Sequence, residues 1–390
     1  MFIASLSSHV VFVSFLLAAC FVARSSWDIC QVLLAVGFVA CGISNAIYHP
    51  TSSAMVADMS RGRERLRGDG YAAFGLVSNL SLVVAFGSMY PVLHMRLEEY
   101  SWMWVGFMGL GAGALLLNCW ILKETLPSAA EGGPTRKPCS CRRAVSELTK
   151  GCRLVWQDPF LRFFVLIASL APMAVMCTIV LLSAYQVVAL EYGNARASIT
   201  GVVLPIQGAF ASAMMSPLIR RSSANRLLLF VLVASAVGGI TAGAGAASPS
   251  LKVRESCFWV GMSVLSMGRN LIEPCSKTIT SLRVAPEHQG NVFACFHLVT
   301  SLLHVTVGLL WPEVFFNPRA DGLARGAIFL ATSGALIICA FGFIALVRAT
   351  GPPAKDAHSR TSTSSGDESS ESDDGVAGSA SDEEVSTENA

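Results

Sequence analysis

The sequence predicts an all-α integral membrane protein, a bundle of about ten transmembrane helices in two halves. Hydrophobic residues make up 53% of the 390 positions and charged residues only 14%. Such a composition leaves too few polar side chains to cover a soluble globule. The hydrophobic residues also form segments of roughly 20 or more residues, long enough to cross a bilayer core, and Gly, Pro or charged residues separate these segments.

These segments follow one another along most of the chain. Four lie before the longest gap, at residues 2–23, 28–57, 69–94 and 100–122, and six lie after it, at residues 161–190, 197–219, 226–248, 256–281, 289–315 and 324–348. The first segment could alternatively be a signal peptide, but it lacks the basic residues with which a signal peptide begins.

The distribution of Lys and Arg predicts the orientation in the membrane. Short cytoplasmic loops hold an excess of basic residues. Three alternate loops are basic, around residues 61–67, 136–153 and 220–226, whereas the loops on the opposite side hold few Lys or Arg. We therefore expect these three loops and both termini to be cytoplasmic, in either the plasma membrane or an endomembrane.

The longest gap between spans divides the chain into two bundles. Residues 124–160 are rich in Pro, Gly and basic residues and predict a cytoplasmic linker loop between a four-helix bundle (1–123) and a six-helix bundle (161–350). Residues 351–390 are Ser-rich and acidic, and they predict a disordered cytoplasmic tail. A kinase could phosphorylate the serines there that precede acidic residues; the alternative is a tail that is only solvated.

Charge and cysteine usage exclude several other classes of protein. A net charge of +2 gives no basic face for nucleic acid. Most of the 12 cysteines lie in apolar segments and predict no disulfide framework. Cys139, Cys141 and Cys152 share one polar loop, where bound metal or palmitate is the alternative to reduced thiols, and we expect no metal and no cofactor. An intramembrane enzyme is disfavoured because no nucleophile with its base and no phosphate-binding loop is present.

The second and eighth spans predict an internal repeat. When the two spans are aligned with an offset of 224 residues, four pairs of positions correspond: Asn45 with Arg269, His49 with Glu273, Pro50 with Pro274 and Ser52 with Ser276. The polar residues in each span are four positions apart and therefore share one face of a helix. Duplicated halves with polar residues at matching depth are common in transporters.

Three short motifs resemble landmarks of the major facilitator superfamily, whose members have twelve helices in two halves of six. Residues 57–65 (ADMSRGRER) resemble the turn between the family's fourth and fifth helices, residues 123–127 (KETLP) resemble the end of its sixth, and residues 284–290 (VAPEHQG) resemble the turn between its tenth and eleventh. Within the family, the chain is most similar to the drug-antiporter and proton-coupled folate transporter branch. The resemblance implies alternating-access transport of a small solute.

The same landmarks match the first span of this chain to the family's third helix. We therefore expect the family's first two helices and their signature loop to be absent from the sequence, either because the sequence lacks its N-terminal part or because the protein itself is shortened. The first helix lines the transport path in the family, so a chain without it could fail to transport. The alternative function is a non-transporting pseudo-transporter that acts as a membrane receptor or regulator.

The strongest candidate site residues are two charged residues within the eighth span. A charge at the bilayer centre costs about 2.5–3.5 kcal/mol on insertion scales, so it normally faces a partner or a cavity. Arg269 and Glu273 lie one helical turn apart, and we expect each to neutralise part of the other's charge. A static pair that only stabilises packing is the alternative. We expect Lys277, one turn further, to extend toward the cytoplasm.

Histidines and amides at membrane depth complete the candidates. Histidine titrates near neutral pH and suits a proton relay, which favours His49 beside Asn45, and His297 and His304 on one face of the ninth span. Gln207 could bind substrate, although a hydrogen bond between helices is the favoured interpretation for it and for two other amides, Asn79 and Gln186. The sequence therefore predicts a proton-coupled carrier of a small anionic or zwitterionic organic solute.

Overall fold

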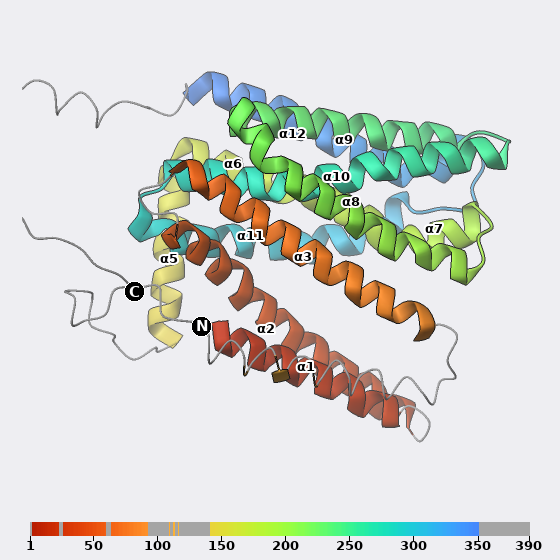
Figure 1. Ribbon diagram of the computed structural model, residues 1–390, viewed down its shortest axis with the longest axis horizontal. Coiled ribbons are helices and arrows are strands. Elements are labelled where there is room, and N and C mark those ends of the chain that lie inside the picture. The colour runs from red at the N-terminus through yellow and green to blue at the C-terminus, as the bar shows by residue number, and fades with distance from the viewer. Residues whose placement is uncertain are drawn as a thin grey trace, which may run out of the picture. The chain divides into compact units, whose positions relative to one another are not determined.

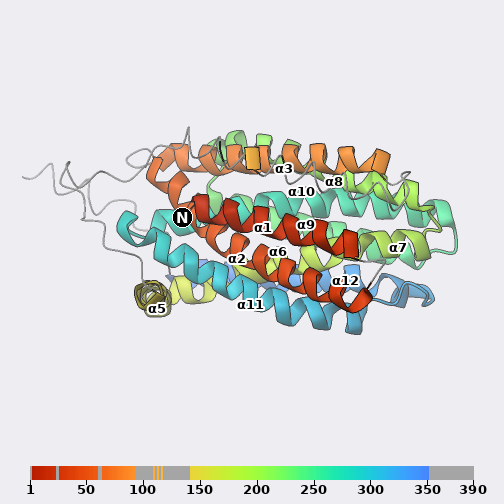
Figure 2. The same cartoon turned by 90° about the horizontal axis from the view of Figure 1, so that it is seen from below.

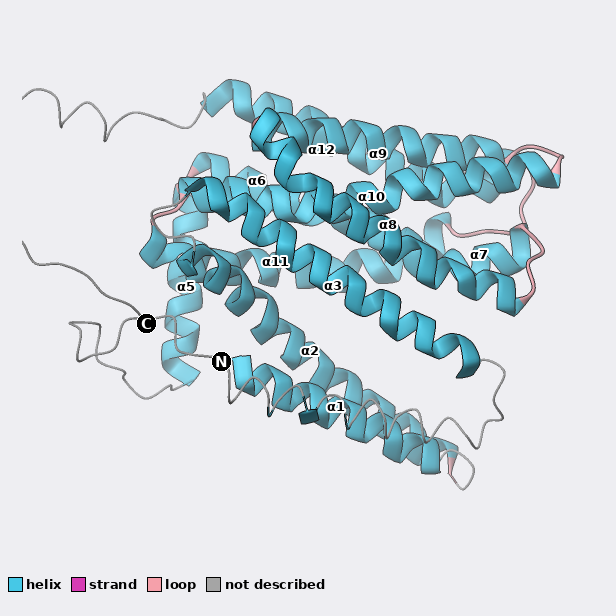
Figure 3. Cartoon of the chain, viewed as in Figure 1, coloured by secondary structure: helices cyan, strands magenta, loops and turns pink. Residues whose placement is uncertain are grey.

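The computed structural model describes residues 2–22, 26–59, 64–92, 109, 112–113, 116 and 141–350. In these ranges every regular element is helical, which confirms the predicted all-α bundle (Figures 1 and 3). Most of the expected span at residues 100–122 lies outside the described residues. The expected disordered tail, residues 351–390, also lies outside them.

The helices follow the predicted spans closely. They are α1 (Phe2–Val22), α2 (Trp27–Met59), α3 (Glu64–Val92), α5 (Cys141–Gln157), α6 (Pro159–Val180), α7 (Leu182–Ala189), α8 (Asn194–Arg221), α9 (Ala224–Ala246), α10 (Leu251–Arg283), α11 (Gln289–Phe315) and α12 (Ala327–Thr350), with short 3-10 turns η3 (Pro286–His288) and η4 (Gly322–Gly326). The expected span at residues 161–190 differs, because the helix breaks at Leu181 between α6 and α7.

Five described segments are long and apolar enough to cross a membrane, as judged by length and composition. They are Pro159–Val180, Ile199–Arg221, Ala224–Ala246, Gln289–Phe315 and Gly322–Thr350. Helix α10, which carries several charged residues, is not among them.

Helix α5 lies in the segment that we expected to be a linker loop. It is amphipathic, and it crosses the ends of the long helices (Figures 1 and 2). Asp158 fixes the corner between α5 and α6, because its side chain accepts hydrogen bonds from the backbone N–H groups of Phe160 (2.8 Å) and Leu161 (3.2 Å). Pro159 begins α6, where its fixed φ favours the first helical turn and its missing N–H costs nothing.

The end of the bundle that α5 crosses, here called the α5 end, also holds the described residues next to the three basic loops. The amide of Asn291 at the start of α11 donates to Glu147 of α5 at 3.1 Å. At the start of α3, Asp69 contacts Arg220 near the end of α8 at 2.7 Å. The segments flanking the basic loops therefore share one end of the bundle, as the positive-inside pattern predicts.

The core of the C-terminal bundle is aromatic and aliphatic. Tyr185 of α7 stacks on Phe258 of α10 with ring centroids 5.7 Å apart and meets Phe329 of α12 edge-to-face at 4.9 Å. All three side chains are almost fully buried. Aromatic pairs at these separations contribute about 0.5–1.5 kcal/mol beyond the burial of their surface. They join three helices that are far apart in the sequence.

Small residues allow α9 to approach α10 closely. A Cβ atom built on Gly238 of α9 would lie 2.9 Å from the backbone oxygen of Gly261 of α10, and a Cβ on Gly261 would meet the oxygen of Gly238 in turn. Two helices in contact through their backbones gain dispersion energy that larger residues would prevent. This contact determines how near α10 lies to its neighbour.

We predict that Gly238→Val destabilises the protein by about 1–3 kcal/mol, because the added methyl groups must push α9 away from α10. The measurement is the thermal unfolding temperature of the purified protein in detergent. The matched control is Gly334→Ala in α12, where no atom lies within 4 Å of the added Cβ. Equal unfolding temperatures for Gly238→Val and wild type would contradict the close contact.

Candidate functional site

Helix α10 provides the central residues of the candidate site. Arg269, Glu273 and Lys277 follow one another at one-turn spacing and share one side of this 33-residue helix. The helix continues through Pro274, and two residues further the hydroxyl of Ser276 donates to the backbone oxygen of Ile272 at 2.8 Å. The charged residues therefore lie within one continuous helix, away from both of its ends.

The ion pair on α10 joins Glu273 to Lys277. The ammonium of Lys277 lies 2.8 Å from Oε1 of Glu273, and the Lys277 side chain is only 18% exposed. Our expectation that Lys277 extends toward the cytoplasm is therefore wrong. A Glu four residues before a Lys is the favoured orientation for an ion pair along a helix, which explains the preference of Glu273 for this partner.

Arg269 has a different environment from the one we expected. Among the described residues, no carboxylate oxygen lies within 4.0 Å of its guanidinium and no hydrogen-bond acceptor is in reach, although Glu273 one turn away attracts it electrostatically. Its side chain is partly exposed. A guanidinium offers five N–H donors in a planar arrangement that matches carboxylates and phosphates, so Arg269 can bind an anionic group.

Two histidines from other helices face this part of α10. The ring centroids of His49 in α2 and His297 in α11 are 5.3 Å apart. The charges of Glu273 and Lys277 act on both rings. Helices α2, α10 and α11 thus bring four titratable side chains together.

The predicted candidate His304 is not brought into this group. His304 lies two turns beyond His297 on α11 and is exposed, and within the described part of the chain no hydrogen bond or ring contact joins it to the group. The two histidines share a face of α11, but within the described residues the ring contact with His49 of α2 is made by His297. The side chain of Asn45 lies outside the described residues.

An amide pair connects α3 to α10. The side-chain amide of Asn79 in α3 donates to the side-chain oxygen of Asn270 in α10 at 2.9 Å, and it also contacts the hydroxyl of Ser212 in α8 at 3.4 Å. Gly208 leaves room for this pair, because a Cβ there would lie 2.5 Å from Asn79 and 2.6 Å from Asn270. The interhelical role expected for Asn79 is confirmed.

Gln207 and Gln186 also bond between helices, as expected. The amide of Gln207 in α8 donates to the hydroxyl of Ser263 in α10 at 2.8 Å, and that of Gln186 in α7 donates to Thr200 in α8 at 2.5 Å. The side-chain oxygen of Gln207 is buried and has no hydrogen-bond partner among the described residues. This free acceptor keeps Gln207 among the candidates for substrate contact.

Sequence reasoning missed the partners Asn270 and Asp69. Asn270 directly follows Arg269 in a predicted span. A polar residue beside a charged one at membrane depth was the signal that could have indicated it. Asp69 accepts a hydrogen bond from Ser216 as well as contacting Arg220. An acidic residue directly after a basic loop was the signal there, but its partner on α8 is 151 positions away and depends on the fold.

The arrangement has the chemistry of a binding and proton-exchange site. Arg269 can bind an anion, Glu273 can take up a proton, and the imidazoles of His49 and His297 can give and accept protons. In the described ranges, no three His, Cys, Asp or Glu side chains are grouped to hold a metal ion.

Several solved structures share the fold of this chain. They include the human organic anion transporter MFSD10 (TETRAN), with a TM-score of 0.65 at 18% identity over 88% of this chain and 80% of that one. A bacterial homologue of the iron transporter ferroportin in an outward-facing state has a TM-score of 0.57 at 14% identity, over 88% and 84%. The proton:xylose symporter XylE has 0.62 at 11% identity, over 90% and 80%. No curated protein matches the chain in sequence.

The family assignment comes from the sequence itself. The sequence model of the Major Facilitator Superfamily matches residues 1–307, well over half of the chain. The matched region includes α2, α10 and the part of α11 that carries His297, so it contains the candidate site. This chain belongs to the Major Facilitator Superfamily.

Proposed function

We propose that this chain is a secondary active transporter that moves a small anionic organic solute by alternating access and couples this movement to protons. The proposal depends on one observation: the permanent positive charge of Arg269 has no ion-pair or hydrogen-bond partner among the described residues. Membership of a transporter superfamily supports the general class. Family membership leaves the solute open, so the argument depends on the site.

Arg269 is placed at a depth that suits a central binding site. It is the nineteenth residue of α10, roughly 27 Å from the start of a helix about 50 Å long. A charge at such a depth is expensive unless it faces a partner or an aqueous path. An anionic solute that enters the site supplies the missing partner. One similar fold belongs to a protein described as an organic anion transporter, which is compatible with this solute class.

Proton coupling follows from the spacing of Arg269 and Glu273. The carboxylate of Glu273 repels an arriving anion and competes with it for the guanidinium. A proton on Glu273 removes both effects, so proton and anion favour each other's binding. Glu273 is half exposed, so with solvent screening the coupling is about 1 kcal/mol, or roughly fivefold in affinity. In this mechanism His49 and His297 carry the proton to and from Glu273.

Alternating access requires the two bundles to separate at one end while they close at the other. At the α5 end, the contact that must open is Asp69 with Arg220, whose side chains are 25% and 67% exposed. Exposed ion pairs contribute only about 0–1 kcal/mol. A contact of this strength can hold the closed form and still break in every cycle.

We predict that Arg269→Ala weakens anion binding about 10- to 100-fold, because the solute loses a charge-assisted hydrogen bond worth about 1.5–3 kcal/mol. The measurement is thermal stabilisation of the purified protein by a panel of small carboxylates and sulfonates, followed by uptake of the best anion into proteoliposomes. Arg226→Gln, at the exposed start of α9, is the matched control. Unchanged anion uptake by folded Arg269→Ala would exclude this residue from the mechanism, and an absence of flux in the wild type for the whole panel would favour a non-transporting receptor.

We predict that Glu273→Gln separates anion binding from proton coupling. Glutamine resembles the protonated acid, so anion affinity at neutral pH should rise about fivefold while an imposed pH gradient no longer accelerates uptake. The assay compares uptake into proteoliposomes with and without an inward proton gradient. His304→Gln, which lies outside the histidine pair, should keep its response to the gradient. A gradient response that survives in Glu273→Gln would refute the coupling role.

A further inference from the structure

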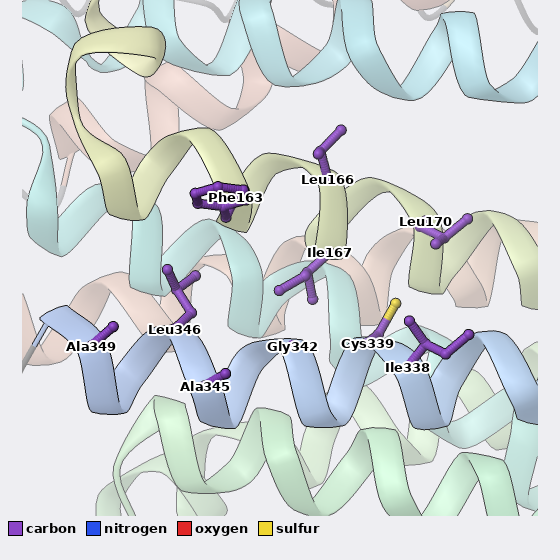
Figure 4. Close-up of a pocket in the computed structure, with 10 residues that line it drawn as sticks. All are labelled: Phe163, Leu166, Ile167, Leu170, Ile338, Cys339, Gly342, Ala345, Leu346 and Ala349. Atoms are coloured by element: carbon purple, nitrogen blue, oxygen red, sulfur yellow. The ribbon is translucent and has the colours of Figure 1, made fainter.

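A second feature of the protein lies on its outer surface, away from the charged residues of α10. Helices α6 and α12 enclose an apolar groove of about 450 Å³ (Figure 4). It is lined by side chains of both helices: Phe163, Leu166, Ile167 and Leu170 from α6, and Ile338, Cys339, Gly342, Ala345, Leu346 and Ala349 from α12. No charged side chain contributes to this lining.

Small residues on α12 create the groove. Gly342 lies opposite Ile167, and a Cβ atom at position 342 would be 3.5 Å from Cδ1 of Ile167. Figure 4 shows Ile167 pointing from α6 toward α12. The side chains at the rim are exposed, with 51% for Phe163 and 68% for Ile338. On two helices apolar enough to cross a membrane, such a groove fits a hydrocarbon chain.

A positive charge lies at one end of the groove. The guanidinium carbon of Arg162 is 5.0 Å from the ring centroid of Phe163, which lines the groove, and 5.4 Å from that of Trp156. Cation–π contacts of this kind hold the guanidinium in place and leave its N–H donors available. Within the described ranges no carboxylate lies within ion-pair distance of Arg162. Arg348, exposed in the last turn of α12, adds a second positive charge at the same end.

The neighbouring helix has the residue pattern expected at a membrane surface. Helix α5 is amphipathic and crosses the ends of the spanning helices at this point (Figure 2). Its Trp156 is 70% exposed and Arg153 is also exposed. Tryptophan with nearby basic residues is typical of the boundary between acyl chains and headgroups.

We propose that this groove binds an anionic phospholipid, with an acyl chain between α6 and α12 and the phosphate on Arg162. The positive charges and the apolar lining are complementary to the two parts of such a lipid. Basic residues next to membrane spans attract anionic headgroups in preference to zwitterionic ones. The lipid would connect α5, α6 and α12, and the proposal is independent of the solute site on α10.

The experiment uses the full chain reconstituted in vesicles of phosphatidylcholine with one fifth phosphatidylglycerol. The protein is extracted in mild detergent, and native mass spectrometry counts the lipids that remain bound. We expect wild type to retain phosphatidylglycerol in preference to phosphatidylcholine, and Arg162→Gln to retain about 5- to 10-fold less. Arg226→Gln removes one exposed arginine elsewhere and should retain as much as wild type.

A second variant keeps the test decisive if Arg162→Gln does not give a monodisperse protein. Gly342→Leu fills the groove without touching Arg162, and it should also lose the bound phosphatidylglycerol. Three results would overturn the proposal: equal phosphatidylglycerol retention by wild type and the variants, equal retention of both lipids by wild type, or a lipid-free dimer that Gly342→Leu converts to a monomer. The last result would identify a second copy of the chain as the occupant.

Discussion

The rest of the structure depends on how α10, with three charged residues along one side of its interior, is kept within an apolar bundle. Arg269, Glu273 and Lys277 share one side of α10, and each would be costly against lipid. Neighbouring helices therefore cover α10 from several directions. The Gly238–Gly261 contact brings α9 against its apolar side, and the Asn79–Asn270 bond holds α3 beside its polar residues. The close packing of α9 against α10 contributes stabilising free energy, which offsets the free-energy cost of holding the polar residues of α10 inside the bundle.

The same constraint explains why the polar residues were visible in the sequence and their partners were not. Hydropathy predicted the long helices because each must be apolar along most of its length, and it singled out Arg269 and Glu273 as exceptions. Spacing alone could not choose the partner of Glu273, since Arg269 and Lys277 are both four residues away; the order of Glu before Lys was the signal that favoured Lys277. Likewise, His297 and His304 share a face of α11, but only the position of α2 decides that His297 meets His49.

Helix α5 was missed for a different physical reason. Hydropathy finds helices that cross a membrane, whereas α5 has an amphipathic pattern within a polar segment rich in Gly and Pro. Its helical period would have been detectable in a search for basic amphipathic helices. The cap of Asp158 followed by Pro159 marked the start of the next helix, α6, and therefore the place where α5 has to end. The position of α5 across the bundle ends, in contrast, depends on tertiary contacts such as Asn291 with Glu147.

The charges on α10 also indicate how the proposed cycle responds to the membrane potential. With neutral histidines, Arg269, Lys277 and ionised Glu273 give the empty site a net charge of +1. A bound monovalent anion together with a proton on Glu273 leaves that charge at +1, whereas an anion alone lowers it to zero. Moving a charge through the membrane potential changes its energy by about 2.3 kcal/mol per 100 mV. A one-to-one ratio of proton to anion therefore lets the empty and loaded forms reorient with equal electrical work, so the proton gradient alone drives net transport.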